Sequence, residues 1–279
     1  MDLTIVVYEK IDRVAKITMN WPEKYNPLGG LMLEELDKAF DAAVTDNDVR
    51  VIVLAGAGKN FSAGHDLGTE LEGEYNKAHP YPPGFPGQMR RTEDRNTIAY
   101  LKWRDLPKPT IAMIHGYCIM AAYGLASTCD IIIASDDVKF ADRAVRWGSA
   151  HIQYFSFPWE LGFRKAKEYL FTGDYIDAQE AWRLGLVNRV VPRERLEEET
   201  MALANRIALQ DSFALMLAKR SINETQDRMG FRDAILSAFK NYMIATAADA
   251  RERSGMARQE GESVAEYVRR RDERFGDHL

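Results

Sequence analysis

The sequence predicts an α/β fold in which strand–strand–helix repeats form residues 1–193 and helices alone form residues 194–279. Two alternating segments near the start flank a short polar turn, a pattern typical of a β-hairpin. Runs rich in β-branched residues then alternate with segments whose apolar residues recur at helical spacing. From about residue 194 only the three- and four-residue spacing remains. Since no Ser/Gly linker separates the two parts, we expect the helical part to pack on the core or on a neighbouring subunit.

The first repeat follows the hairpin directly. LTIVVYEK and VAKITMN are the two predicted hairpin strands. After the loop WPEKYNPLGG, the segment LMLEELDKAFDAAVTD repeats its apolar residues at helical spacing, which predicts a helix. VIVLAGAG is apolar and rich in β-branched residues, which predicts a buried strand.

Residues 68–98 interrupt this rhythm. They are polar and rich in proline, and they have no clear period. A long segment without secondary structure inside a compact domain is usually a functional lid or disordered. We therefore expect one of these two in residues 68–98, and we expect a lid there to set the choice of substrate.

The rhythm resumes at TIAYLKWRDL, a predicted helix that Pro107 and Pro109 end. TIAMIHGYCI and DIIIASD are predicted buried strands on either side of the helix AAYGLASTCD, and VKF is a short extended segment. Gly173 suits the end of the helix KAKEYLFTG, and Asp177 suits the start of the helix DAQEAWRLGL, which the strand VNRVVP follows. Four helical segments complete the chain: RLEEETMALANRIALQ, SFALMLAKRSINE, RDAILSAFKNYMIATAADARERSG and ESVAEYVRRRDERF.

Composition excludes several classes of protein. The net charge of −5 argues against nucleic acid or an anionic membrane as the main partner. No apolar run approaches the roughly 20 residues that span a bilayer, and MDLTIVVYEK lacks the features of a signal peptide. Cys118 and Cys129 lie in apolar stretches without metal-binding spacing, so we expect two buried thiols in a reducing cytoplasm and no metal site.

Two strand-to-turn junctions are the candidate functional motifs. No phosphate-binding loop, dinucleotide fingerprint or nucleophile elbow is present. What remains is FSAGHDL at residues 61–67 and HGYCIMAAYGLAS at residues 115–127, where a buried strand leads into small residues. Small residues permit close backbone approach, and two N–H groups that converge on one point form an oxyanion hole. Many α/β folds contain glycine turns, so ordinary structural turns remain an alternative at this stage.

Together with a helical tail, the segments WPEKYNPL, FSAGHDL, HGYCIMAAYGLASTCDIIIAS and KAKEYLFTGDYIDAQEAWRLGLVNRVV resemble the crotonase superfamily, which includes enoyl-CoA hydratases and isomerases. The resemblance covers nearly the whole chain. It implies a spiral of strand–strand–helix turns with a helical C-terminal part used for trimerisation, and assembly as a homotrimer or homohexamer. It also implies acyl-CoA thioester substrates, with coenzyme A entering as part of the substrate and no separate cofactor.

The resemblance assigns two backbone donors to the thioester oxygen, which would stabilise an enolate. The first is the N–H of His65 and the second is the N–H of Ala121, where the family usually has the middle glycine of a G-G-G run. Met120 and Ala122 replace the other two glycines. The two glutamates that activate and protonate water in family hydratases correspond to Gly124 and Ala144, so both carboxylates are missing.

Several side chains could take over this chemistry. The His65 imidazole projects from the first turn, at a position where family members that decarboxylate malonyl-type thioesters also have a histidine. His151 lies close to a position of a polar aromatic residue in such enzymes. Tyr117 and Tyr154 are further polar candidates. His115 is expected to be structural.

The alternative readings of the charged and aromatic residues are structural. We expect Asp142 to form an ion pair with Arg143 or Arg146 rather than a catalytic dyad. YFSFPW at residues 154–159 either narrows the acyl pocket or is a core stripe.

Coenzyme A needs partners for its phosphates and its adenine. By the resemblance, Lys24 meets the nucleotide end, and the backbone of Ala63, Asp66 and Leu67 surrounds the adenine. Lys240 or the run Arg269–Arg271 could reach a phosphate, although we expect this run to be a solvated charged face.

Three functions stay open. The chain is an acyl-CoA enzyme of the enoyl-CoA hydratase/isomerase type, a divergent decarboxylase or C–C hydrolase of β-dicarbonyl compounds, or a CoA-ester binding protein without turnover. All three rest on an intact thioester turn beside a missing glutamate pair.

Overall fold

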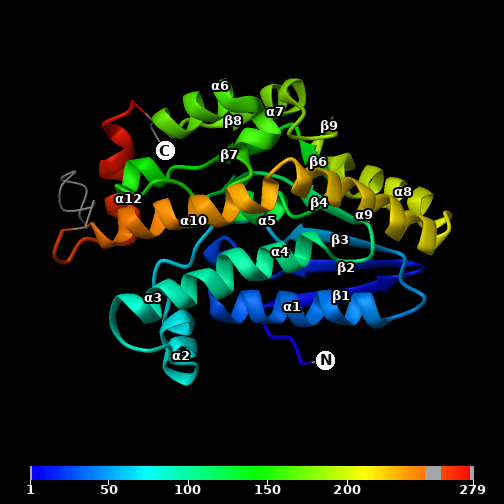
Figure 1. Ribbon diagram of the computed structural model, residues 1–279, viewed down its shortest axis with the longest axis horizontal. Helices are drawn as coiled ribbons and strands as arrows, with labels where there is room; N and C mark the ends of the chain where they lie inside the picture. Colours follow the sequence, from blue (N-terminus) through cyan, green and yellow to red (C-terminus); the bar gives the residue numbers. More distant parts are fainter. Residues whose placement is uncertain (1, 249–258, 277–279) are drawn as a thin grey trace.

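A six-stranded sheet forms the centre of the molecule in the computed structural model, which describes residues 2–248 and 259–276 (Figure 1). The strand order is β1-β2-β3-β4-β6-β9. Only β1 and β2 pair antiparallel, as the predicted hairpin, and the other neighbours pair parallel. The strands are β1 (Val6–Ile11), β2 (Val14–Met19), β3 (Val51–Gly56), β4 (Thr110–Ile114), β6 (Ile131–Ser135) and β9 (Arg189–Val191).

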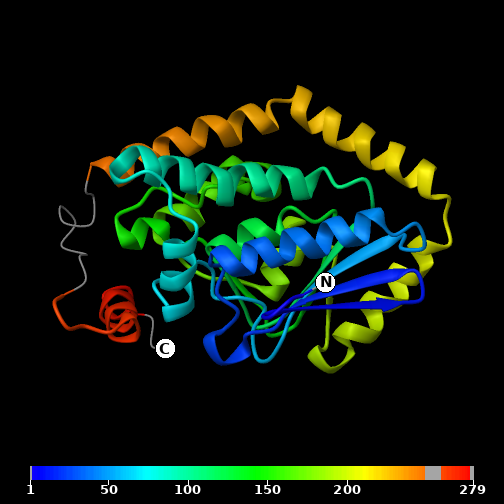
Figure 2. The same cartoon turned by 90° about the horizontal axis from the view of Figure 1, so that it is seen from below.

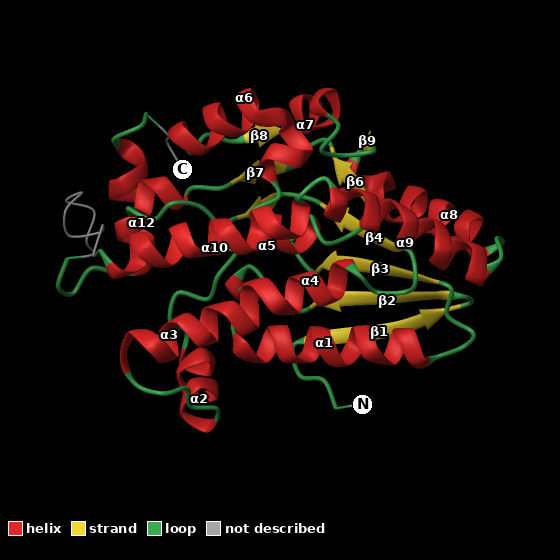
Figure 3. Ribbon diagram, in the orientation of Figure 1, coloured by secondary structure: helices red, strands yellow, loops and turns green. Residues whose placement is uncertain are grey.

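A second, smaller sheet of order β5-β7-β8 lies beside the first (Figure 3). Its strands are β5 (Tyr117–Ile119), β7 (Lys139–Ala141) and β8 (Ile176–Asp177). The single predicted strand TIAMIHGYCI was therefore wrong, because the chain leaves β4 at His115 and enters the other sheet as β5. Gly116 makes this possible: its φ is +56°, and a Cβ there would lie 2.3 Å from the carbonyl oxygen of Lys59.

Helices cover both sheets. They are α1 (Gly30–Thr45), α2 (Glu70–Ala78), α3 (Gly84–Glu93), α4 (Ala99–Arg104), α5 (Ala121–Ala126), α6 (Phe157–Thr172), α7 (Ala178–Leu184), α8 (Leu196–Ala208), α9 (Ser212–Arg228), α10 (Phe231–Ala247) and α12 (Val264–Glu273). Short 3-10 helices occupy Pro22–Lys24, Ala144–Trp147 and Arg193–Arg195, and a π-helical turn occupies Asp94–Ile98. The predicted helix ends are confirmed at Gly173, and at Asp177, whose side chain accepts the N–H of Glu180.

The alternation of side chains along β3 divides the core into two layers. Ile52 and Leu54 face the cluster that contains α1, whereas Val51 and Val53 face α8 on the opposite side of the sheet. All six residues of β3 are buried, as is typical of a parallel strand covered on both faces. The α/β fold with a mostly helical C-terminal region is thus confirmed.

The prediction that residues 68–98 lack secondary structure was wrong. They form α2, α3 and the π-helical turn, and the Thr69 side chain caps α2 by accepting the N–H of Glu72. The sequence hides α2 because none of its residues is buried, so no apolar stripe marks it. Prolines between α2 and α3 further obscure the period.

The C-terminal helices dock on the core through apolar and ionic contacts. Figure 2 shows α9 and α10 running along one side of the molecule, past α3 and α4. The predicted helix over residues 232–255 ends as α10 at Ala247, and its residues 249–255 lie outside the described part of the chain. On α12, Arg271 is buried beside Asp272, so the expectation of a solvated face was wrong for Arg271, while Arg269 is exposed.

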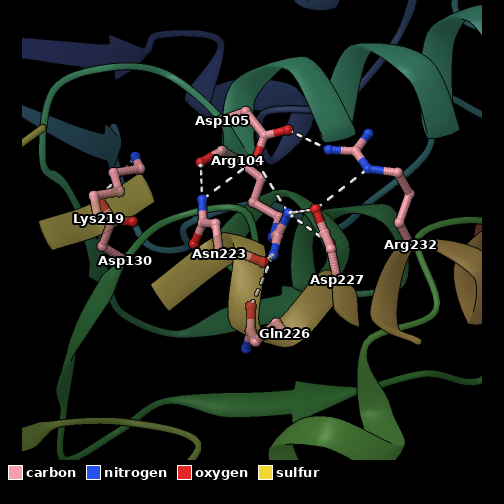
Figure 4. Close-up of polar contacts among 8 residues, drawn as sticks. All are labelled: Arg104, Asp105, Asp130, Lys219, Asn223, Gln226, Asp227 and Arg232. Carbon is pink, nitrogen blue, oxygen red and sulfur yellow. Dashed lines mark hydrogen bonds and ion pairs between the residues drawn. The ribbon is translucent and has the colours of Figure 1, made fainter. Parts of the chain in front are cut away.

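Arg104 at the end of α4 anchors α9 (Figure 4). Its guanidinium donates to the carbonyl of Asn223 and to Oε1 of Gln226, both at 3.0 Å, and pairs with Asp227. Asn223 returns a bond to the Arg104 carbonyl at 3.3 Å. The Arg104 side chain is only 5% exposed. Charged hydrogen bonds of this kind stabilise more than exposed ion pairs.

The substitution Arg104→Met tests this anchor. We expect it to lower the free energy of unfolding by about 2 kcal/mol, because Asp227 and Gln226 lose a charged partner. Arg220→Met on α9 is the matched control. Its side chain is 70% exposed and, within residues 2–248 and 259–276, forms an ion pair only with Glu224, so the change should stay below about 0.5 kcal/mol. Urea titration of both variants measures the difference, and equal values would contradict the anchoring role.

Candidate active site

The turn at residues 61–67 is held between two neighbouring backbone segments. On one side, Ser62 forms a parallel bridge with Cys118 of β5. On the other, His65 forms a parallel bridge with Leu28: the N–H of Leu28 donates to the Gly64 carbonyl at 2.8 Å, and the N–H of Asp66 donates to the Leu28 carbonyl at 3.4 Å. In such a bridge the N–H of His65 points away from Leu28.

Asn26 holds the start of the turn in place through side-chain hydrogen bonds. Its side chain is fully buried and donates to the carbonyls of Asn60 and Phe61 at 3.1 and 3.0 Å, and its Oδ1 accepts the N–H of Trp21. Asn26 also has a φ of +51°, a conformation that asparagine tolerates better than most residues. The segment WPEKYNPL around Asn26 gives no sign of this role, because the bonded carbonyls lie more than 30 residues away.

Gly64 brings the turn into contact with the start of α5. A Cβ at Gly64 would lie 2.5 Å from the Ile119 carbonyl oxygen and 3.3 Å from the Ala121 backbone nitrogen. The φ of Gly64 is +93°, which a side chain would also oppose. The structure thus brings the two predicted junctions, FSAGHDL and HGYCIMAAYGLAS, side by side.

The backbone N–H groups of His65 and Ala121 are both available at this contact. Ala121 is the first residue of α5, so its N–H has no intrahelical acceptor. Within residues 2–248 and 259–276, neither N–H donates a hydrogen bond to another group. Met120, which precedes Ala121, has a φ of +56° and donates its own N–H to the Ala141 carbonyl at 2.8 Å. Two adjacent unpaired donors are the elements of an oxyanion hole.

Apolar side chains fill the space beside Gly124. A Cβ at this position would lie 3.2 Å from both Ile152 Cδ1 and Tyr100 Cε2, and 3.4 Å from Tyr154 Cβ. A longer side chain at position 124 would therefore have to displace Ile152 or the tyrosine rings. The Tyr100 hydroxyl donates to the Ala121 carbonyl at 3.2 Å, which ties this apolar wall to the start of α5.

The buried Ala144 occupies the position at which the second carboxylate is expected, and Asp142 holds the backbone there. Its carboxylate accepts the N–H groups of Ala144 and Ile152 at 2.9 and 2.8 Å. Burial raises the pKa of Asp142 to about 6, against the opposing effect of these two backbone bonds. Asp142 thus holds residues 144–152 in place beside the turn.

The expected ion pair of Asp142 with Arg143 or Arg146 was wrong. Arg143 instead pairs with Asp272 of α12 at 2.7 Å, and Arg146 pairs with Asp174 at 2.7 Å. The backbone explains this outcome, because the N–H groups of Ala144 and Ile152 already occupy the Asp142 carboxylate.

The His65 imidazole contacts a residue that the sequence analysis did not single out. Its Nε2 lies 3.1 Å from Oε1 of Gln153, whose side chain is 3% exposed. Burial lowers the pKa of His65 from its usual 6.5 to about 4, against smaller opposing effects of Gln153 and Glu72. His65 is therefore neutral near pH 7.

The other aromatic candidates have structural partners. Nδ1 of His151 lies 2.6 Å from the Ile152 carbonyl oxygen, its ring packs on Phe155, and burial lowers its pKa. His115 bonds the Gly58 carbonyl at 3.1 Å. The Tyr117 ring stacks on Tyr175.

The predicted coenzyme A residues lie at the surface near the turn. Lys24, Ala63 and Leu67 are exposed. The Asp66 side chain is engaged: its Oδ1 accepts the N–H of Thr69 at 2.7 Å, and its Oδ2 accepts the Thr69 hydroxyl at 2.6 Å. It thereby closes the turn that leads into α2.

Comparison with known proteins assigns the family. Residues 9–278 match the family model described as "Enoyl-CoA hydratase/isomerase". This chain belongs to the enoyl-CoA hydratase/isomerase family. It is 41% identical to the Mycobacterium tuberculosis protein named "Putative enoyl-CoA hydratase EchA13", over 85% of this chain and 79% of the relative. It is 32% identical to the short-chain-enoyl-CoA hydratase of Clostridium acetobutylicum, over 80% of this chain and 82% of the relative.

Solved structures agree with this assignment. A crystal structure of an enoyl-CoA hydratase/isomerase from Xanthobacter autotrophicus Py2 superposes with a TM-score of 0.86 at 31% identity, covering 98% of this chain and 99% of the other. The family member described here therefore has the crotonase fold that its motifs predict.

In residues 2–248 and 259–276, no cluster of three His, Cys, Asp or Glu side chains could hold a metal ion. Over the same residues, no helix is long and apolar enough to cross a membrane.

Gly64→Ala tests the contact between the turns. A positive φ alone costs an alanine about 1–2 kcal/mol, and the Ile119 carbonyl adds a clash at Gly64. Gly68→Ala is the control, because Gly68 has a φ of +108° but nothing within 4 Å of a Cβ. We expect Gly64→Ala to lower the melting temperature more and to weaken CoA-ester binding. Equal effects in both variants would contradict the close contact.

A titration tests the state of His65. Since its pKa of about 4 lies below the usual 6.5, the folded protein binds fewer protons there than the unfolded chain, so stability falls as pH drops from 6.5 to 4. We expect the His65 imidazole resonance, assigned by its loss in His65→Gln, to keep its neutral shift down to about pH 5. Protonation near pH 6.5 would contradict the burial of the ring.

Proposed function

We propose that this protein is an acyl-CoA enzyme that stabilises a thioester enolate with the N–H groups of His65 and Ala121. The observation that carries the proposal is the contact at Gly64, which brings two unpaired N–H donors together. The thioester oxygen would accept both hydrogen bonds. Negative charge builds up on that oxygen as the enolate forms, so these donors bind the transition state more strongly than the ground state. A single donor of this kind is typically worth about 10²–10³ in rate.

The chemistry at the α-carbon departs from that of a hydratase with paired carboxylates. Gly124 and Ala144 have no side-chain group that can donate or accept a proton. Ile152 and Tyr100 fill the space beside Gly124. We infer that simple hydration of an unsubstituted enoyl-CoA is slow, although the names of the relatives favour a lyase of the hydratase type.

A second candidate is a decarboxylase or C–C hydrolase of β-dicarbonyl substrates on the same fold. The neutral His65 next to Gln153 favours it. Decarboxylation releases CO2 and needs the oxyanion hole but no added water, whereas in a C–C hydrolysis the neutral imidazole would act as the base that activates the water consumed. His151 is the alternative base, although its Nδ1 is engaged with a backbone carbonyl. A CoA-ester binding protein without turnover is the third candidate.

Coenzyme A would bind as part of the substrate, with no other cofactor. The exposed Lys24 would meet its phosphates, and the backbone of the exposed residues Ala63 and Leu67 would surround its adenine. Lys240, exposed on α10, is a further candidate for a phosphate contact.

We also propose that the protein assembles as a homotrimer or homohexamer. Phe213 and Leu217, one turn apart on α9, are 64% and 42% exposed, which supports a covered surface there. In this assembly residues 1–193 would form the core, and residues 194–279 would form the subunit contacts.

A panel of substrates tests the reaction. The protein is incubated with crotonyl-CoA, methylmalonyl-CoA and cyclic β-diketones, and products are measured by mass spectrometry. We expect crotonyl-CoA hydration at least about 10²-fold slower than by the Clostridium acetobutylicum relative, since general acid–base catalysis contributes about 10²–10⁴. Hydration at a comparable rate would contradict our interpretation of Gly124 and Ala144. Binding of all esters without turnover would favour the third candidate.

His65→Ala separates the two roles of this residue. The variant keeps the backbone N–H and removes the imidazole. If only the N–H acts, kcat on the true substrate falls less than about tenfold, because the oxyanion hole is intact. A loss beyond about a thousandfold would contradict a backbone-only role and assign the imidazole to the chemistry. His79→Ala, which removes an exposed imidazole at the end of α2, is the matched control and should leave kcat unchanged.

A further inference from the structure

The side chain of Gln153 has one half bonded and one half available. Its Oε1 faces Nε2 of His65 at 3.1 Å, and the residue is only 3% exposed. Within the described part of the chain, the amide nitrogen of Gln153 has no hydrogen-bond partner. This atom nevertheless remains in contact with solvent. A buried amide normally satisfies both ends. Gln153 therefore keeps two N–H donors for a ligand.

His65 complements this donor with an acceptor. When Nε2–H donates to Gln153, the neutral ring keeps its lone pair on Nδ1. Nδ1 of His65 also lacks a hydrogen-bond partner in residues 2–248 and 259–276, and it too remains in contact with solvent. The pair therefore offers one acceptor and two donors side by side.

The positions of His65 and Gln153 in the chain place the pair near the proposed site of the acyl group. The imidazole belongs to the residue whose N–H is the first oxyanion donor, and it extends several bonds beyond that N–H. Gln153 follows Ile152, whose side chain covers Gly124 on the helix that begins with the second donor, Ala121. With the thioester oxygen at the two N–H groups, the pair lies next to the first carbons of the acyl chain.

Ile152, which precedes Gln153, belongs to an apolar wall, and Glu72 is a charged group that acts on His65. Ile152, Tyr100 and Tyr154 form the neighbouring wall at Gly124. A plain hydrocarbon chain would cover Gln153 and leave its N–H groups unpaired, which opposes binding. A chain with an oxygen substituent would pair with them. Sites built around such groups discriminate strongly against analogues that lack the polar atom.

We propose that His65 and Gln153 form a polar subsite that selects acyl-CoA esters with a hydroxyl or carbonyl oxygen on the β-carbon. This inference rests on the proposed placement of the thioester at His65 and Ala121, and it names the substrate class of that site. A 3-hydroxyacyl group would accept from Gln153 and donate to Nδ1 of His65. A 3-oxoacyl group would accept from Gln153 alone.

Calorimetric titration tests the subsite with butyryl-CoA, 3-hydroxybutyryl-CoA and acetoacetyl-CoA. We expect both oxygenated esters to bind wild-type protein at least about tenfold more tightly than butyryl-CoA, the effect of about one net hydrogen bond. In Gln153→Met, which keeps the length of the side chain, this preference should shrink to less than about threefold. Gln179→Met, at an exposed position of α7, is the control and should keep the wild-type preference.

The outcomes separate this inference from the proposed function. Equal wild-type affinity for butyryl-CoA and the oxygenated esters would overturn the subsite and leave the thioester site intact. Failure of every ester to bind would overturn both. If Gln153→Met does not fold, ¹⁵N spectra of the wild-type protein decide: Nδ1 of His65 should shift with 3-hydroxybutyryl-CoA and not with butyryl-CoA, and equal shifts would overturn the subsite.

Discussion

The backbone contact at Gly64 is the constraint on which the rest of the site depends. The turn after β3 can reach the start of α5 only because no side chain stands between Gly64 and the Ile119 carbonyl. Asn26 and the bridge to Leu28 hold the turn from the other side. Since these bonds use the opposite edge of the turn, the N–H of His65 is left on the edge that faces α5. The same packing that closes the core thus leaves two donors unpaired where a substrate can meet them.

The side chains around these donors give the site its individual chemistry. Ile152 and Tyr100 make the wall at Gly124 apolar, and Asp142 uses its carboxylate to hold the backbone of residues 144 and 152. Two polar side chains near the turn contact each other, the neutral His65 and Gln153. In this chain, apolar side chains therefore surround the position where the sequence comparison expects the first of two carboxylates. Under the proposed function, the backbone would provide charge stabilisation, and the wall would determine which acyl group fits.

Local features of the fold could be predicted from the sequence, whereas long-range contacts could not. The hairpin, β3 and the helix ends at Gly173 and Asp177 depend on neighbouring residues, and the structure confirms them. The helix α2 was missed because it buries no side chain. Gln153 was missed because its partner His65 is 88 residues away and nothing in the local pattern marks it. The Asp142 ion pair was wrong because backbone N–H groups, which a sequence pattern does not display, occupy its carboxylate.

The central claim is that two backbone N–H groups bind the thioester oxygen, and the carbonyl stretch of a bound acyl-CoA measures this most directly. Isotope-edited infrared difference spectra of butyryl-CoA labelled with ¹³C at the thioester carbonyl report the hydrogen bonds to that oxygen. The account predicts a shift to lower frequency on binding, present in wild-type protein and in His65→Ala, because both keep the two N–H donors. A bound thioester whose carbonyl frequency equals that in water or rises above it would contradict the account.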